Sequence, residues 1–75
     1  MITNRDDLRS WVEELFDTLD SGERSAAQRE TAIEAATDLV ASRARSAGLL
    51  YGRDWSVWLD QRGETVLIEH LTISQ

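Results

Sequence analysis

The feature that most constrains the fold is an apolar stripe within residues 4–20, NRDDLRSWVEELFDTLD. Apolar residues recur there at the spacings i, i+3, i+4, i+7, i+8 and i+11: Leu8, Trp11, Val12, Leu15, Phe16 and Leu19. This spacing predicts an α-helix with one buried face. Thr3 or Asn4 can cap its start, and Asp6 and Asp7 suit the first turn because the helix dipole is positive there.

Residues 23–47 predict a second, longer helix. Ser25 and Gln28 match a capping box, and Gly48 is a suitable left-handed stop. At 1.5 Å per residue this helix would be about 37 Å long against about 25 Å for the first, so part of it should overhang. The link between the two is short, which predicts that they pack as antiparallel neighbours.

Residues 54–70, DWSVWLDQRGETVLIEH, predict a β-hairpin. Its strands would cover about 54–60 and 65–73, joined by a turn at 61–64 in which Gly63 supplies a positive φ. The expected fold is therefore α+β, an antiparallel helical hairpin followed by a two-stranded β-hairpin (α-α-β-β). At this length, the chain is expected to be one small domain, 1–75.

Alternation along the expected strands assigns their side chains to two faces. One face, with Trp55, Val57 and Leu59 opposite His70, Ile68 and Val66, should rest on the helices. Together with the helices this predicts a core that includes Trp11, Leu15, Phe16, Leu19, Ile33, Val40, Val57 and Ile68. The other face would hold Trp58, Leu67 and Leu71, with Ile73 further along. Either residues 49–51 fold over that face or another protein chain covers it, which makes Trp58, Leu67 and Leu71 candidate partner-binding residues. A one-residue slip of register would exchange the two tryptophans.

A chain of 75 residues without cysteine has few means of stabilising itself. Disulfides are excluded, and one histidine without cysteine argues against a structural zinc site. The chain must then rely on well-packed helices, on oligomerisation or on a bound partner.

Negative charge is concentrated in the first helix. The chain has a net charge of −6, and all eight basic residues are arginine. The first helix accounts for −4, with six acidic residues against two arginines. Four acids are expected to form a band opposite the apolar stripe: Asp6, Glu13, Asp17 and Asp20. This band is either a solvated face or a docking surface for a basic protein, where it would imitate a row of phosphates.

Few residues suggest catalysis or cofactor chemistry. His70 and Glu69 are adjacent in an expected strand and would point to opposite faces, and no glycine-rich phosphate loop is present. Arg43, Arg45 and Arg53 are too few for a nucleic-acid-binding face on so acidic a chain. We therefore expect no enzyme activity, no metal or other cofactor, no small-molecule substrate and no direct contact with nucleic acid. The start MITNRDDLRS does not resemble a signal peptide, and no apolar run has the length of a membrane span, which predicts a cytoplasmic protein without membrane contact.

These observations predict a small acidic, non-catalytic protein that binds another protein. The favoured class is an inhibitor or regulator of a basic nucleic-acid-handling protein. Anti-restriction and anti-CRISPR proteins of phages are similar in size and charge. The analogy is with this class of proteins and rests on these two properties alone. The alternative is a homodimeric accessory or antitoxin-like protein whose hairpins join into one sheet.

Overall fold

The structure, a computed structural model, describes residues 1–19 and 22–73, of which Ile73 is described without its side chain. Its elements are α1 (Arg5–Leu19), α2 (Ala26–Ser46), α3 (Ser56–Trp58), the π-helical segment η1 (Leu59–Gly63) and α4 (Glu64–Ile73). The α3, η1 and α4 segments follow one another without a break. The expected α+β fold is therefore wrong: where a β-hairpin was predicted the chain is helical, and no strand occurs in the described ranges.

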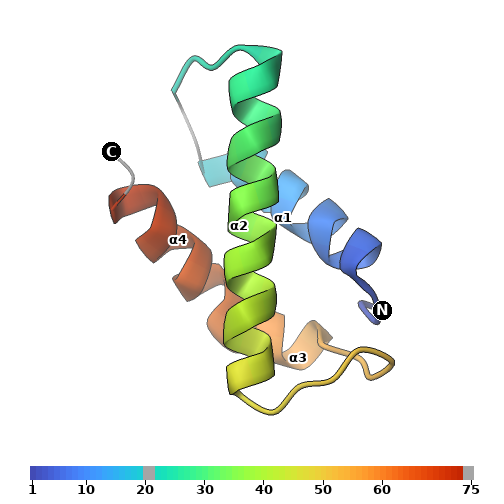
Figure 1. The fold of residues 1–75 in the computed structure, drawn as a ribbon. Helices are drawn as coiled ribbons and strands as arrows, with labels where there is room; N and C mark the ends of the chain where they lie inside the picture. The colour runs from blue at the N-terminus through green and yellow to red at the C-terminus, as the bar shows by residue number, and fades with distance from the viewer. Residues whose placement is uncertain (20–21, 74–75) are drawn as a thin grey trace.

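The helices form a small three-helix arrangement in which α2 crosses over both α1 and α4 (Figure 1). All three pack against one another, and the molecule measures 35 × 21 × 17 Å. The α3 and η1 segments pass behind the C-terminal half of α2 before α4 runs back along it (Figure 1).

The two predicted helices are confirmed, and so are the signals at their starts. Asn4 caps α1, because its Oδ1 accepts a hydrogen bond from the Asp7 amide at 2.9 Å. Ser25 and Gln28 form the predicted capping box of α2, with distances of 3.2 and 3.0 Å. The sequence predicts that the first helix ends at Asp20-Ser21-Gly22, and the first two of these residues lie outside the described ones.

The predicted stop of the second helix is also confirmed. Gly48 has a φ of +88°, which a residue with a side chain rarely adopts. Its amide donates to the Arg45 carbonyl at 3.0 Å, and the Leu49 amide donates to the Ala44 carbonyl at 3.0 Å. These two bonds make a Schellman motif, and Leu49 packs against the core as such motifs favour.

One hydrophobic core joins all three helices. Its buried members are Leu8, Val12, Phe16, Ile33, Ala36, Val40, Ala41, Ala44, Trp55, Leu59 and Leu67. Trp11, Leu15 and Leu19 are half-buried against this core, so the apolar stripe of α1 faces it as predicted. The first buried residue of α2 is Ile33, which means that the first two turns of α2 extend beyond the core. This is the overhang that the helix lengths predicted.

Two expected core residues lie at the surface instead. Val57 is 67 % exposed and Ile68 is 42 % exposed. Trp55 and Leu59, from the same expected face, are fully buried, and so is Leu67, which was expected on the opposite face. The reason is the period of the backbone: a helix buries positions three to four apart, whereas the hairpin required positions two apart.

The π-helical segment explains why Leu59 and Leu67 share a face. Positions eight apart on a regular α-helix differ by about 80° in direction. The η1 segment contains one residue more per turn, marked by the Glu64 amide donating to the Leu59 carbonyl. Because the wider turn takes up this extra residue, Leu59 and Leu67 are related like positions seven apart on an α-helix. Their directions then differ by only about 20°. Gly63 lies inside this segment with helical φ, so the predicted positive φ is wrong.

The segment between α2 and α3 is fastened to the N-terminal residues. The Gly52 amide donates to the Thr3 carbonyl at 3.0 Å, and the Trp55 amide donates to the Ile2 carbonyl at 2.9 Å. These backbone bonds hold residues 50–55 in place where no regular element does so.

Candidate functional site

The predicted acidic band is largely engaged within the fold. Asp17 accepts two hydrogen bonds from the Arg29 guanidinium, at 3.0 and 2.7 Å. Glu13 lies 3.5 Å from Arg29 and 3.0 Å from Arg9. Both carboxylates therefore point toward α2, beside the apolar stripe of α1 and not opposite it. The direction of these two side chains depends on where α2 packs, and the periodicity of α1 alone does not reveal that position.

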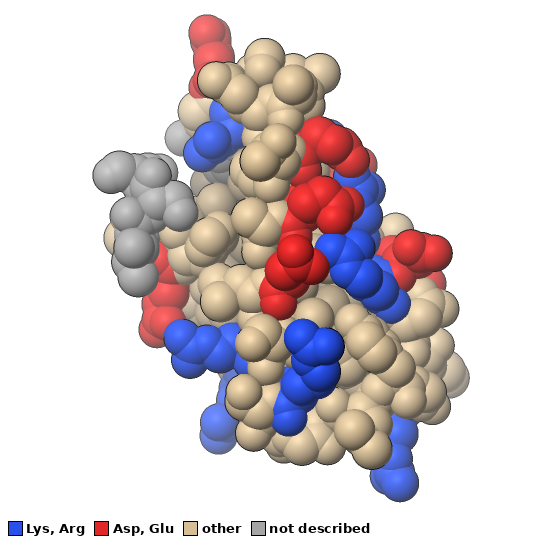
Figure 2. All heavy atoms as spheres, viewed as in Figure 1, with Lys and Arg blue, Asp and Glu red and all other residues tan. Residues whose placement is uncertain are grey.

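The same contact continues along both helices as an ionic ladder. Arg9 donates to Glu34 at 2.7 Å and also pairs with Glu30, and Arg5 reaches Glu34 at 2.9 Å and Asp38 at 2.7 Å. The ladder consists of Arg5, Arg9, Glu13, Asp17, Arg29, Glu30, Glu34 and Asp38. Acidic and basic side chains consequently alternate along one side of α2 (Figure 2).

The ladder changes the ionisation of its members. Hydrogen bonds from Arg9 and then Arg5 lower the pKa of Glu34, and the hydrogen bond from Arg29 lowers the pKa of Asp17. Both groups therefore stay ionised at a lower pH than an ordinary carboxyl group would, and their charge is balanced inside the molecule. Asp6 is exposed and has no ion-pair partner among the described residues, while Asp20 lies outside them.

The three predicted apolar anchors all lie in or against the hydrophobic core of the chain itself. Leu67 is fully buried in the core, and Leu71 is half-buried. Trp58 is half-buried against the core, and its Nε1 is buried without a hydrogen-bond partner in the described part of the chain. Of residues 49–51, which could have covered a hairpin, Leu50 and Tyr51 are exposed.

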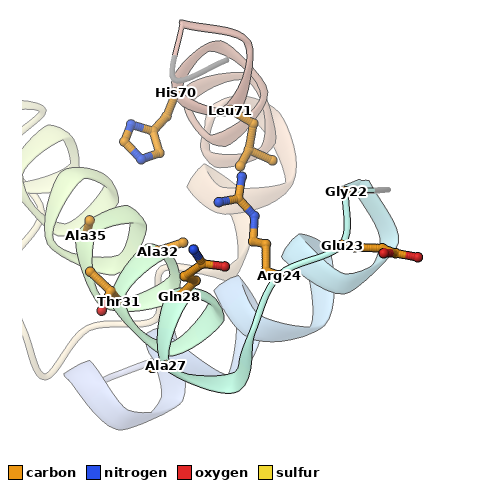
Figure 3. A pocket seen from close by; sticks show the side chains of 10 residues that line it. All are labelled: Gly22, Glu23, Arg24, Ala27, Gln28, Thr31, Ala32, Ala35, His70 and Leu71. Atoms are coloured by element: carbon orange, nitrogen blue, oxygen red, sulfur yellow. The ribbon is translucent and has the colours of Figure 1, made fainter.

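Leu71 borders a groove of about 890 Å³ between the N-terminal half of α2 and the end of α4 (Figure 3). The groove is lined by Gly22, Glu23, Arg24, Ala27, Gln28, Thr31, Ala32, Ala35, His70 and Leu71. His70 and Leu71 point into it from α4, and Gln28 points into it from α2, while Glu23 points away. Sequence analysis did not identify this groove, although the predicted overhang of α2 was a signal for it.

A smaller hollow of about 220 Å³ lies on the opposite flank of α1 from the ladder. Trp11, Glu14, Leu15 and Thr18 line it. The tryptophan ring reaches across to η1, because its Cη2 lies 3.2 Å from where a Cβ of Gly63 would be. The hollow therefore sits at the seam between α1 and the start of α4.

One carboxylate borders the hollow, and two others occur close to Trp11 and Gly63 along the chain. Glu14 lines the hollow, Asp7 lies one turn before Trp11 on α1, and Glu64 follows Gly63 directly. None of these three carboxylates forms an ion pair with any residue that the structure describes. The hollow thus combines a half-buried indole ring with unbalanced negative charge. The spacing of the apolar stripe predicts Trp11 as a core residue and does not indicate this combination.

The described residues contain no group of three or more histidine, aspartate or glutamate side chains placed to hold a metal ion. Within the same residues, no helix has the length and apolar character needed to cross a membrane. No protein-family model, curated protein or solved structure matches the chain.

Proposed function

We propose that this protein is a non-catalytic protein-binding protein, and that it receives a basic side chain of its partner in the hollow of α1. The observation that supports this is the half-buried ring of Trp11 in a hollow that Glu14 also lines, with no ion-pair partner for Glu14 among the described residues. The favoured partner remains a basic nucleic-acid-handling protein, whose activity the contact would inhibit or regulate in the cytoplasm.

The chemistry of the hollow fits an arginine or lysine side chain. A cation over a tryptophan face gains about 0.5–1 kcal/mol when exposed and more when it is desolvated. The carboxylate of Glu14 stands at the same hollow, so it can pair with that cation. The volume suits one side chain, because sites for drug-sized molecules are typically about 300–1,000 Å³. Tryptophan is also among the residues that contribute most to binding at interfaces.

This proposal moves the predicted docking surface around α1. Glu13 and Asp17 balance Arg29 in the ladder and have less charge to offer a partner. Glu14, which lines the hollow, takes their place, together with Asp7 one turn before Trp11 on α1. The alternative of a homodimer joined through hairpins required strands, and it is not proposed because residues 56–73 are helical.

An oligo-arginine peptide is a direct probe of this hollow, with binding measured by calorimetry. The test variant is Asp7→Asn/Glu14→Gln, and the control is Glu23→Gln/Glu69→Gln, which changes the net charge equally at exposed positions elsewhere. We expect the test variant to weaken binding about tenfold, since it loses two contacts of about 0.2–1 kcal/mol each and part of the local field. We expect only a small effect of the control.

Equal losses in both double variants would show that the peptide senses overall charge and would contradict a specific hollow. Undetectable binding to the unmodified protein at low salt would contradict the proposal itself. Binding should also weaken as salt increases, because exposed charges are screened over about 8–10 Å at physiological ionic strength.

A further inference from the structure

The arginines of this chain fall into different environments. Three belong to the ionic ladder, where each contacts two or three carboxylates: Arg5, Arg9 and Arg29. Four others are exposed and form no ion pair within the described ranges: Arg43, Arg45, Arg53 and Arg62. Residues 43–64 also carry Asp54, Asp60 and Glu64, so this stretch has a net charge of +1 within a chain of net charge −6.

These four arginines belong to the end of the molecule at which α2 terminates. Arg43 and Arg45 are in the last turn of α2, Arg53 is in the segment that follows it, and Arg62 is in η1, which passes behind that part of α2 (Figure 1). In Figure 2 the lower third of the visible face carries basic side chains and no acidic ones. The nearby carboxylate of Asp54 is occupied by hydrogen bonds from Ser56 and from the Ile2 amide.

An aromatic platform lies at the same end. The ring of Tyr51 stacks on that of Trp55 with a centroid distance of 4.8 Å and an interplanar angle of 15°. Trp55 is fully buried and donates from Nε1 to the Leu50 carbonyl at 3.2 Å, whereas Tyr51 is 43 % exposed. The buried tryptophan and the backbone bonds to Ile2 and Thr3 hold this platform in place before any ligand arrives.

We propose that this end of the molecule binds single-stranded nucleic acid, with the four arginines contacting phosphates and Tyr51 stacking on a base. The planar guanidinium group suits two-pronged contacts with phosphate oxygens. Proteins that bind single strands combine such a basic surface with exposed aromatic rings on which bases stack. An acidic protein partner could also form ion pairs with the four arginines, but such a partner would not need an aromatic ring held at the surface. The platform of Tyr51 and Trp55 therefore favours nucleic acid as the ligand.

The inference revises the expectation of no direct contact with nucleic acid. That expectation rested on three arginines, and a hairpin would have placed Arg62 in a turn. The helical segment adds Arg62 and the folded loop adds Tyr51. The contact does not use the residues that line the hollow of α1, which are Trp11, Glu14, Leu15 and Thr18. A protein with both sites would bind where a basic protein holds its nucleic acid.

Four phosphate contacts set the expected salt dependence. Each contact with a single strand contributes about −0.7 to the slope of log K against log salt, so the slope should be close to −3. The net charge of −6 opposes binding at longer range. The dissociation constant should therefore lie in the range of non-specific binding, about 10⁻⁴–10⁻⁶ M at physiological salt.

The test is fluorescence anisotropy of a labelled oligothymidine across a salt series. Arg43→Gln/Arg45→Gln should weaken binding about tenfold and make the slope shallower by about 1.4. The control Ser10→Glu/Thr72→Glu makes the same change in net charge at exposed positions on α1 and α4, and it should leave the slope unchanged. Tyr51→Leu keeps apolar cover over Trp55 but removes the ring, and it should weaken binding at least about fivefold.

Several results would overturn the proposal. One is no binding of the oligonucleotide even at low salt. A second is equal competition by polyglutamate, which would indicate an acidic protein or a second copy of this chain as the ligand. A third is an equal loss in the control variant. If Arg43→Gln/Arg45→Gln unfolds, Arg62→Gln gives the same test on η1. Unchanged binding by Tyr51→Leu, with a duplex bound as tightly, would exclude the single-stranded mode.

Discussion

Gly63 lies so close to Leu59 that a Cβ on Gly63 would be 2.6 Å from the Cδ2 of Leu59. The same Cβ would lie 3.2 Å from the Cη2 of Trp11, so it has little room on either side. Alanine normally favours a helix over glycine by up to about 1 kcal/mol, but overpacking a core costs about 1–3 kcal/mol.

We therefore expect Gly63→Ala to lower the free energy of unfolding by about 1–2 kcal/mol, measured in urea. Gln61→Ala, at an exposed position of the same segment, is the control and should change it by less than about 0.5 kcal/mol. A Gly63→Ala variant as stable as the unmodified protein would contradict the close packing of η1 on α1.

The two tryptophans should respond differently to replacement by phenylalanine. Trp55→Phe loses ring volume in the core and the hydrogen bond to Leu50, and should cost about 2 kcal/mol or more. Trp58→Phe also loses volume, but it removes a buried donor without a described partner, so its cost should be within about 1 kcal/mol. Thermal unfolding of both variants checks this, and the reverse order would show that the Nε1 of Trp58 is satisfied.

Polar substitutions distinguish the helix from the predicted hairpin. Val57→Gln and Ile68→Gln change exposed positions of the helix, so each should alter stability by less than about 0.5 kcal/mol. Leu67→Ala removes a fully buried side chain and should cost about 2–5 kcal/mol. Chemical unfolding of the three variants separates the two folds, because a hairpin would make Val57 and Ile68 the sensitive positions.

The ladder predicts a specific loss of stability in acid. The pKa of Glu34 is lowered in the folded state, so its contribution is complete above the usual carboxyl value near 4.5 and is lost as the pH falls through the lowered pKa. We expect unfolding midpoints to decrease below about pH 4.5, and to decrease less for Glu34→Gln than for the unmodified protein. Parallel pH profiles for the two proteins would contradict this role of Glu34. Glu69→Gln, at an exposed position outside the ladder, is the control.

The first two helices could be predicted because their signals are local. The stripe from Leu8 to Leu19, the capping box at Ser25 and the left-handed Gly48 each act within a few residues. Each of them also agrees with the tertiary packing. Such agreement between local preference and final fold is what allows a prediction from sequence alone.

The remainder could not be predicted because its apolar pattern is ambiguous. Trp55, Val57 and Leu59 alternate like a strand, and short apolar runs do not distinguish strand from helix. The buried positions Trp55, Leu59 and Leu67 do follow helical spacing, but the extra residue of η1 disturbs the period. Asp54 forms an Asx turn directly before the helix by accepting a hydrogen bond from the Ser56 amide at 2.9 Å, and this turn residue was the local sign of a change in backbone direction there.

The candidate site was predictable in composition but not in position. The sequence shows that α1 is acidic. Which of its acids are left for a partner depends on where α2 lies, because Arg29 of α2 engages Glu13 and Asp17. The hollow beside Trp11 likewise requires α4, which approaches α1 through Gly63 only once the chain has folded. Contacts between segments that are distant in the sequence therefore determine which acids of α1 remain unpaired and where the hollow forms.

The η1 segment marks one place where this protein can change in length. A π-helical turn accommodates one residue more than a regular α-helix, so deleting Asp60 or Gln61, both exposed, should leave a continuous α-helix with Leu67 still facing the core. The same deletion within α4 would rotate every later side chain by about 100°. In related chains, gains and losses of a single residue should therefore collect between Leu59 and Gly63.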